Sequence, residues 1–344
     1  MGTAWLCLTV ALLQAPGPRE ETVRYPSGDI HLVATLFLPP GPGPYPAIVI
    51  LHGAEGMPRT SPHYRATAQS LTRLGIAVLL PDRRGIGDSE GRYEEVPDLL
   101  VPARDALAGV AHLRARRDIR RDRIGLYGTS QGGWAAPLAA TLSPDVAFVV
   151  TVSGPGVSRL ESDLAQRANE LIEEGYSDAD TAEINGYRRL LWRYLGGTGE
   201  GYEEVKAAAA RLRDRHWFAR LAPSEPVLPP VALGDPRLQY YRRLRFDPDT
   251  VLPRVTVPLL AFFGAKDRHI PMPESAVRFE VAARRGGNSR ATVHIIPEAG
   301  HGMQVIPEGD IERLRTAGGH GPMGPAPRFA ELRDAWLRQV VGSP

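Results

Sequence analysis

The sequence predicts an α/β fold, with a mostly parallel sheet, helices on both faces of the sheet and an inserted helical cap. Three observations support this prediction. Short apolar runs recur along the chain, helical patterns with one apolar face separate them, and a charged helical stretch interrupts the alternation near the middle. Nearly continuous apolar runs are typical of strands buried on both faces of a parallel sheet. Repeated strand-then-helix units form a doubly wound fold.

The N-terminal segment resembles a signal peptide. An apolar stretch from Ala4 to Leu13 has the length of a signal-peptide core, and small residues allow cleavage after Ala15, so that residues 1–15 would form a leader. Because no Lys or Arg precedes this stretch, a misassigned start or an N-terminal core strand is the alternative. A processed chain would be secreted or periplasmic and would lose Cys7, its only cysteine, whereas an unprocessed chain would be cytoplasmic.

Composition narrows the range of partners. Of the 344 residues, 43% are hydrophobic and 23% are charged, and the formal net charge is +2, as is ordinary for a soluble globular enzyme. Basic residues are interspersed with acidic ones, so we expect no nucleic-acid partner. No apolar run reaches the ~20 residues that a bilayer-spanning helix needs, so we expect no stable membrane insertion. The sequence leaves the oligomeric state open.

The elements of the core are expected in a simple order. Residues 22–41 read as two extended segments around a turn at Pro26–Asp29. The strands of the parallel sheet are expected at residues 46–53, 75–82, 123–128, 146–154, 257–264 and 292–300. Apolar side chains recur at helical spacing between Ala103 and Leu113, and a last helix is expected at residues 328–341. The core therefore comprises residues 16–155 and 251–344.

Residues 156–250 depart from the strand-and-helix alternation. They contain three helix-like segments that are strongly charged on one face. Aromatic residues occur among them, namely Trp192, Tyr194, Trp217, Phe218, Tyr240 and Tyr241. We interpret this segment as a cap that is inserted after one strand and covers the C-terminal edge of the sheet. The alternative is a peripheral bundle whose aromatic residues pack only in a core of their own.

The pattern G-x-S-x-G occurs twice, at residues 128–132 and 87–91. Ser130 directly follows a predicted strand and precedes a helix-forming stretch. A turn of this kind holds the serine in a strained conformation and leaves space only for small neighbours. The following helix also directs its N–H groups and dipole at a developing oxyanion. Ser89 lies beyond its strand between Asp88 and Glu90, which would repel an oxyanion, so the sequence favours Ser130 as the nucleophile.

A serine nucleophile needs a base to take its proton and a carboxylate to orient that base. In folds that carry this turn, the acid and then the histidine follow the serine along the chain, each on a loop after a strand. Asp267 comes three residues beyond the apolar run that ends at Gly264, which predicts that it is the acid. The alternative is a loop acid that pairs with Lys266 or Arg268.

Four histidines follow Asp267 in the chain. His301 lies just past the last predicted strand between two glycines, which predicts that it is the base. His320, in a Gly-rich loop, is the second candidate. His294 lies within a strand pattern, where a packing role is more common, and His269 is almost adjacent to Asp267, which is a tight geometry for a triad.

The loop after the first parallel strand is expected to complete an oxyanion hole. In this fold one N–H donor comes from that loop and the other from the residue after the nucleophile. We therefore expect the backbone N–H of Gln131 and that of Ala54 or Glu55 to be the donors. His52, which precedes Ser130, is interpreted as a turn residue and not as the base.

The segment "DRRGIGDSEG", residues 82–91, is interpreted as a structural loop that lines the site. Its glycines favour turns, and we expect Asp82 and Arg83 to pair locally. We assign this segment no chemistry.

These motifs together resemble the α/β-hydrolase superfamily. The segments "LHGAEG", "DRRGIGDSEG", "GTSQGG", "FGAKDRHIP" and "PEAGHGM" occur in the order of the family, and the first three are most similar to the prolyl-oligopeptidase/dienelactone-hydrolase-like branch of secreted bacterial esterases. The resemblance implies the α/β-hydrolase fold and the triad Ser130, Asp267 and His301. Dienelactone hydrolases carry cysteine at the nucleophile turn, so the serine argues against that activity.

The sequence thus predicts a serine hydrolase that cleaves small-molecule carboxylic esters through an acyl-enzyme. An acyl thioesterase, or a small-peptide or amide hydrolase on the same triad, is the alternative. A non-catalytic binding protein with the same fold is a third hypothesis from a different class. We expect no cofactor and no metal, because the sequence contains neither a Gly-rich phosphate loop nor a cluster of metal ligands at the usual spacing.

Overall fold

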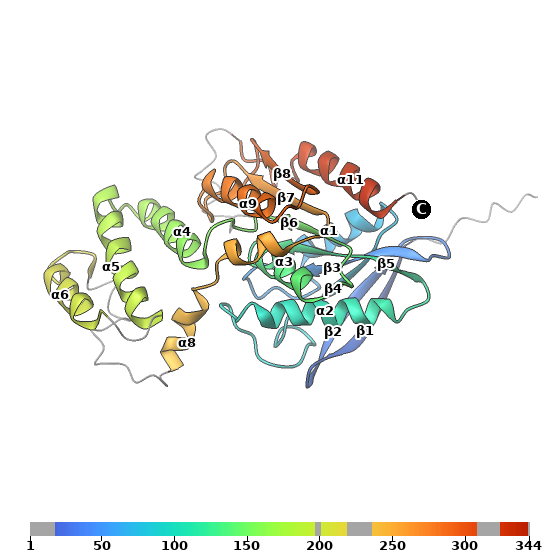
Figure 1. Ribbon diagram of the computed structural model, residues 1–344, viewed down its shortest axis with the longest axis horizontal. Helices are drawn as coiled ribbons and strands as arrows, with labels where there is room; N and C mark the ends of the chain where they lie inside the picture. The colour runs from blue at the N-terminus through green and yellow to red at the C-terminus, as the bar shows by residue number, and fades with distance from the viewer. Residues whose placement is uncertain (1–17, 197–200, 219–235, 308–323, 343–344) are drawn as a thin grey trace, which may run out of the picture.

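An eight-stranded sheet forms the centre of the protein (Figure 1). The computed structural model describes residues 18–196, 201–218, 236–307 and 324–342. The strands are β1 (Arg19–Ser27), β2 (Ile30–Leu38), β3 (Tyr45–Leu51), β4 (Ala77–Pro81), β5 (Ile119–Thr129), β6 (Phe148–Val152), β7 (Leu259–Gly264) and β8 (Ala291–Ile296). Their order in the sheet is β1-β2-β4-β3-β5-β6-β7-β8. The β1–β2 hairpin is antiparallel and joins β4 in antiparallel pairing, and the strands from β4 to β8 are parallel.

Helices cover both faces of this sheet. They are α1 (Pro62–Thr72), α2 (Leu100–Arg114), α3 (Gly132–Leu142), α9 (Glu274–Arg285) and α11 (Pro327–Val341). Helices α2, α3 and α9 pack against one face, and α1 and α11 pack against the other. Side chains alternate between the two cores along each strand. On β3, for example, Val49 faces the first core and Ile48 the second, so the apolar run of this strand is buried on both sides. The predicted α/β fold is confirmed.

A helical insertion separates β6 from β7. It contains α4 (Arg159–Glu173), α5 (Asp178–Gly196), α6 (Tyr202–Leu212) and α8 (Pro236–Arg243), and two short 3-10 turns, Pro248–Thr250 and Leu252–Arg254, lead back to β7. In Figure 1, α5 and α6 lie to the left of the sheet, and α4 lies between them and the core. Aromatic residues of the insertion, Tyr187, Tyr194 and Trp217, are buried together with its leucines in a core of their own. The aromatic side chains therefore stabilise the insertion itself.

Several predictions from the sequence concern residues that the structure does not describe. The predicted leader at residues 1–15, with Cys7, and the second candidate base His320 lie outside the described residues. Among the helices that are described, none is long and apolar enough to cross a membrane.

Candidate active site

Ser130 lies in a tight turn between β5 and α3. Its φ is 52°, in the left-handed region that side chains rarely adopt, so this turn stores backbone strain. Its N–H donates to the Val152 carbonyl at 2.8 Å, which fixes the turn to the neighbouring strand. A Cβ on Gly128 would lie 2.1 Å from the Gly132 carbonyl oxygen, and a Cβ on Gly132 would lie 2.3 Å from the Leu51 carbonyl oxygen. The glycines around the serine are therefore required by the close approach of backbone.

His301 and Asp267 form a hydrogen-bonded pair. His301 Nδ1 lies 2.8 Å from Asp267 Oδ2. The other carboxylate oxygen, Oδ1, accepts the backbone N–H of His269 at 2.8 Å and that of Ile270 at 3.3 Å. Both carboxylate oxygens of this buried side chain are thus held, and the imidazole of His301 has a fixed partner on its Nδ1 side.

The pair is also coupled electrostatically. Burial raises the pKa of Asp267, but the charge and hydrogen bond of His301 outweigh burial and hold that pKa below its usual value. Burial lowers the pKa of His301, but the Asp267 carboxylate, its hydrogen bond and the charge of Glu55 outweigh burial and hold that pKa above its usual value. The site therefore favours an ionised aspartate beside a histidine that readily takes up a proton.

One pocket of about 830 Å³ connects the predicted site residues. Ser130 and His301 line it, as do the three residues expected to supply oxyanion donors, Gln131, Ala54 and Glu55. The structure thus brings the serine, the histidine and the two loops of the predicted oxyanion hole to the same cavity at the C-terminal ends of the parallel strands.

Helix α4 supplies a polar wall of the same pocket. Its lining residues are Arg159, Ser162, Asp163, Gln166, Arg167 and Glu170. Consecutive members of this set are one or three residues apart, and alternate members are four apart, so they lie on one face of the helix. Burial raises the pKa of Asp163, although Arg188 of α5, which also lines the pocket, opposes this shift. The insertion therefore presents charged and hydrogen-bonding groups, and few apolar ones, to the cavity.

The predicted oxyanion donors are free to bind a ligand. Gln131 is the N-cap of α3, where the helix directs its partial positive charge. Within the part of the chain that the structure describes, the N–H groups of Gln131, Ala54 and Glu55 donate no hydrogen bond. Unpaired N–H groups at the rim of a pocket are the donors that an oxyanion needs.

Ser89 and His52 have structural surroundings. The Ser89 hydroxyl donates to the Asp82 carbonyl at 2.9 Å and accepts the Val33 N–H at 2.9 Å, so it closes the turn of residues 82–91 onto β2. His52 is buried and stacks on Tyr64 with ring centroids 4.0 Å apart, and burial lowers its pKa to about 3. A histidine with so low a pKa is a poor base at neutral pH.

His269 lies in the pocket beside the predicted base. It lines the pocket, and its ring centroid lies 4.7 Å from that of His301. Burial and the neighbouring His301 lower its pKa. His294, by contrast, stacks on Phe262 in the sheet with centroids 5.5 Å apart, in agreement with the packing role expected for it. Among the described residues, no group of three or more His, Cys, Asp or Glu side chains is placed to hold a metal ion.

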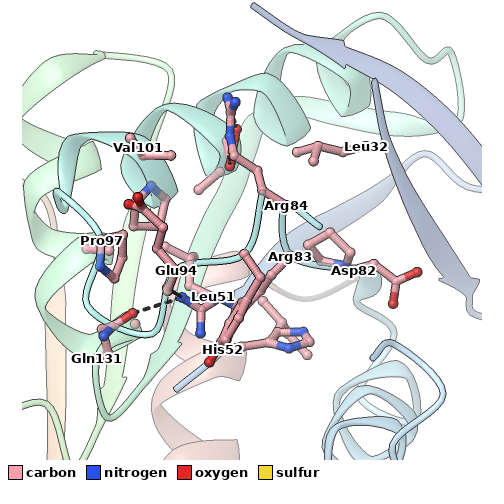
Figure 2. Close-up of a pocket in the computed structure, with 18 of the residues that line it drawn as sticks. Leu32, Leu51, His52, Asp82, Arg83, Arg84, Glu94, Pro97, Val101 and Gln131 are labelled. Atoms are coloured by element: carbon pink, nitrogen blue, oxygen red, sulfur yellow. Dashed lines mark hydrogen bonds and ion pairs between the residues drawn. The ribbon is translucent and has the colours of Figure 1, made fainter. Parts of the chain in front are cut away.

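The loop after β4 differs from its predicted arrangement. The side chains of Asp82 and Arg83 do not pair with each other, and only that of Asp82 has a partner within residues 82–91, the N–H of Asp88. Asp82 binds the side chain of Arg59, accepts its N–H at 2.5 Å and also accepts the N–H of Asp88. Arg83 extends toward the turn that contains Ser130, and Figure 2 shows Gln131 joined to Arg83 by a dashed line. The expectation of local pairing failed for Arg83 because β3 is the neighbour of β4 in the sheet and β5 is the next strand beyond it, so that the loops after both strands are within reach of its side chain.

Comparison with known proteins identifies the family of this chain. A family described as "Alpha/beta hydrolase family" matches residues 48–314. Esterase EstD of Thermotoga maritima is 25% identical over 70% of this chain and 50% of its own length, and acyl-coenzyme A thioesterase 2 of Rattus norvegicus is 32% identical over 41% of this chain and 28% of its own length. This chain therefore spans half or less of these two relatives.

A solved structure, the Pyrococcus furiosus esterase Pf2001, shares the fold. Its TM-score is 0.60 at 16% identity, with 94% of this chain and 92% of that chain covered. The narrower resemblance to the prolyl-oligopeptidase/dienelactone-hydrolase-like branch stays a prediction.

Proposed function

Because this chain belongs to the alpha/beta hydrolase family, we propose that it is a serine hydrolase that cleaves carboxylic esters through an acyl-enzyme. The observation that carries the proposal is the pairing of His301 with the buried Asp267 at the pocket that Ser130 lines. A strained nucleophile turn, an oriented base and free N–H donors on one cavity are the parts that acyl transfer requires.

The proposed reaction has two halves. In the first, His301 Nε2 takes the hydroxyl proton while Ser130 Oγ attacks the acyl carbon, and the carbonyl oxygen becomes an oxyanion facing the N–H groups of Gln131 and of Ala54 or Glu55. The tetrahedral intermediate collapses, the C–O bond to the alcohol breaks, and His301 returns the proton to the leaving oxygen. In the second half, His301 takes a proton from water as the water oxygen attacks the acyl carbon. The bond from the acyl carbon to Ser130 Oγ then breaks, His301 returns the proton to Oγ, and the carboxylic acid leaves. Asp267 stabilises the imidazolium in both halves.

The pocket supports a polar substrate. A long acyl chain laid against the polar face of α4 would desolvate Asp163 and Gln166 without giving them hydrogen-bond partners, which is costly. A short acyl or alcohol group that carries hydroxyl, amide or carboxylate groups would satisfy them. We therefore propose small polar esters in preference to fatty-acyl esters.

An acyl thioesterase is the second candidate. The guanidinium group of Arg188 on the pocket wall suits an anionic substrate, and the rat relative is named as an acyl-coenzyme A thioesterase. The same three residues would catalyse this reaction, with a thiolate as the leaving group in place of an alkoxide.

The test is hydrolysis of p-nitrophenyl esters from acetyl to palmitoyl by wild type beside Ser130→Ala. We expect turnover of the short esters, a decline toward palmitoyl, and no turnover by the variant. A fluorophosphonate probe should label wild type and not Ser130→Ala. If wild type cleaves acyl thioesters or aminoacyl amides and no ester, the ester proposal is wrong. If Ser130→Ala keeps full activity, the assignment of the nucleophile is wrong.

A further inference from the structure

Arg83 links the two loops of the predicted oxyanion hole. Its Nη1 donates to the Gly53 carbonyl at 2.7 Å and to the Ala54 carbonyl at 3.0 Å. Its Nη2 donates to Gln131 Oε1 at 3.0 Å and to the Glu94 carbonyl at 3.3 Å. One guanidinium thus contacts the loop after β3, the residue after the proposed nucleophile and the loop that follows β4. Gly53 and Gln131 are 30 and 48 residues from Arg83 in the chain, and Glu94 is 11 residues away.

The surrounding contacts fix the guanidinium and its partners in turn. The Arg83 guanidinium carbon lies 5.1 Å from the ring centroid of Tyr93, and the Tyr93 hydroxyl also donates to the Ala54 carbonyl. Gln131 Nε2 donates to the Glu95 carbonyl at 2.8 Å. Both ends of the Gln131 amide are therefore occupied, and the Ala54 carbonyl is held from two sides.

Planarity of the peptide unit transmits this restraint to the donors. The carbonyl of Gly53 shares a peptide plane with the N–H of Ala54, and the carbonyl of Ala54 shares one with the N–H of Glu55. In a trans peptide, C=O and N–H point in opposite directions. Two carbonyls that point at Arg83 therefore direct the two candidate N–H groups away from Arg83.

Arg83 itself stays outside the reaction pocket. Ala54, Glu55 and Gln131 line that pocket and Arg83 does not, whereas Arg83 lines a second cavity of about 80 Å³, which Gln131 also borders (Figure 2). Leu32, Pro97 and Val101 form apolar walls of this second cavity. A group in this place can act on the reaction only through the residues that it holds.

We propose that Arg83 is a positioning residue of the oxyanion hole, which aims the N–H groups of the loop after β3 and anchors Gln131 beside Ser130. This inference rests on the proposed serine hydrolase function. Donors that are already aligned before the reaction stabilise the oxyanion without reorganisation, and a displacement of ~1 Å can cost ~10²-fold in rate. The adjacent Arg84 offers a contrast, because it binds the Asp105 carboxylate at 2.7 and 2.8 Å and contacts neither oxyanion loop.

A separate experiment first tests whether a fluorophosphonate probe labels Ser130 of wild type. Unlabelled Arg83→Ala is then compared with the matched control Arg84→Ala. We expect Arg83→Ala to lower kcat ~10²-fold with KM almost unchanged, and Arg84→Ala to keep the wild-type kcat. A boronic acid, which forms a tetrahedral anion on the serine, should bind Arg83→Ala more weakly by a similar factor. Added guanidinium at millimolar concentration should restore part of kcat to Arg83→Ala alone, because the vacated position borders the second cavity.

Arg83→Lys keeps the charge but not the planar fork, so it should also lose kcat, and it serves if the alanine variant does not fold. The inference is overturned if both Arg83 variants retain wild-type kcat. It is also overturned if kcat falls while boronic acid affinity is unchanged and guanidinium restores nothing, since that pattern indicates general destabilisation. If the probe does not label Ser130 of folded wild type, the proposed function fails and this inference fails with it.

Discussion

Replacing Asp267 with asparagine should reverse the tautomer of His301. The carboxylate accepts two backbone N–H groups at Oδ1 and faces His301 Nδ1 with Oδ2. An asparagine must keep its oxygen toward the two N–H donors, so its NH2 group faces His301 Nδ1. Nδ1 then has to accept a hydrogen bond, and the proton of the neutral ring moves to Nε2. In that tautomer His301 cannot take the proton of Ser130.

The size of the effect follows from the cost of the opposite orientation. Turning the amide would restore the active tautomer but would place NH2 against the N–H groups of His269 and Ile270. Two buried donors would lose their acceptor, at a cost of about 1–3 kcal/mol each. A penalty of about 2–6 kcal/mol leaves the active orientation populated ~30-fold to ~10⁴-fold less than the inactive one. The same change in a serine protease triad costs ~10⁴-fold, at the upper end of this range.

The assay is kcat for a short p-nitrophenyl ester, with Asp122→Asn as the control. Asp122 is an exposed carboxylate that pairs with Arg123, so its variant should retain wild-type turnover. We expect Asp267→Asn to lose between ~30-fold and ~10⁴-fold in kcat while its circular dichroism stays native. If a folded Asp267→Asn variant stays within a few-fold of wild type across the pH range, Asp267 does not set the tautomer of His301, and another acid must be sought.

Two further predictions concern pH and packing. Glu55 raises the pKa of His301, and only the neutral imidazole accepts a proton. Glu55→Gln should therefore move the acidic limb of the kcat/KM profile to lower pH. Glu95→Gln, a change in the same pocket, should leave this limb in place. Gly132→Ala should lower the free energy of unfolding in urea by about 3 kcal/mol or more and abolish fluorophosphonate labelling, because its Cβ would lie 2.3 Å from a backbone oxygen of β3. Gly186→Ala, inside α5 with no atom within 4 Å, should instead stabilise the protein by about 0.5–1 kcal/mol, and equal effects of the two changes would contradict this reasoning.

Much of the fold could be predicted from local patterns in the chain. The apolar runs at residues 46–53 and 257–264 correspond to β3 and β7, because burial on both faces of a sheet requires an uninterrupted apolar sequence. The strand-turn-helix around Ser130 could be recognised because the glycines that permit the turn are neighbours of the serine. His301 could be predicted as the base because it follows the acid along the chain and lies just after the last strand. The loops after parallel strands all lie at the C-terminal edge of the sheet, where Ser130 also lies.

The tertiary structure decided what depends on contacts between distant segments. The charged sequence of α4 was visible, but only the fold shows that its polar face lines the pocket while the aromatic residues of the insertion pack in a separate core. Arg83 was assigned no chemistry because nothing in the residues next to it names its partners. Those partners include residues on the loops after β3 and β5; β3 is the neighbour of β4 in the sheet, and β5 is the next strand beyond it. Residue type and local spacing determine strands, turns and candidate groups, whereas the pairing order of strands, set by long-range packing, determines which groups meet.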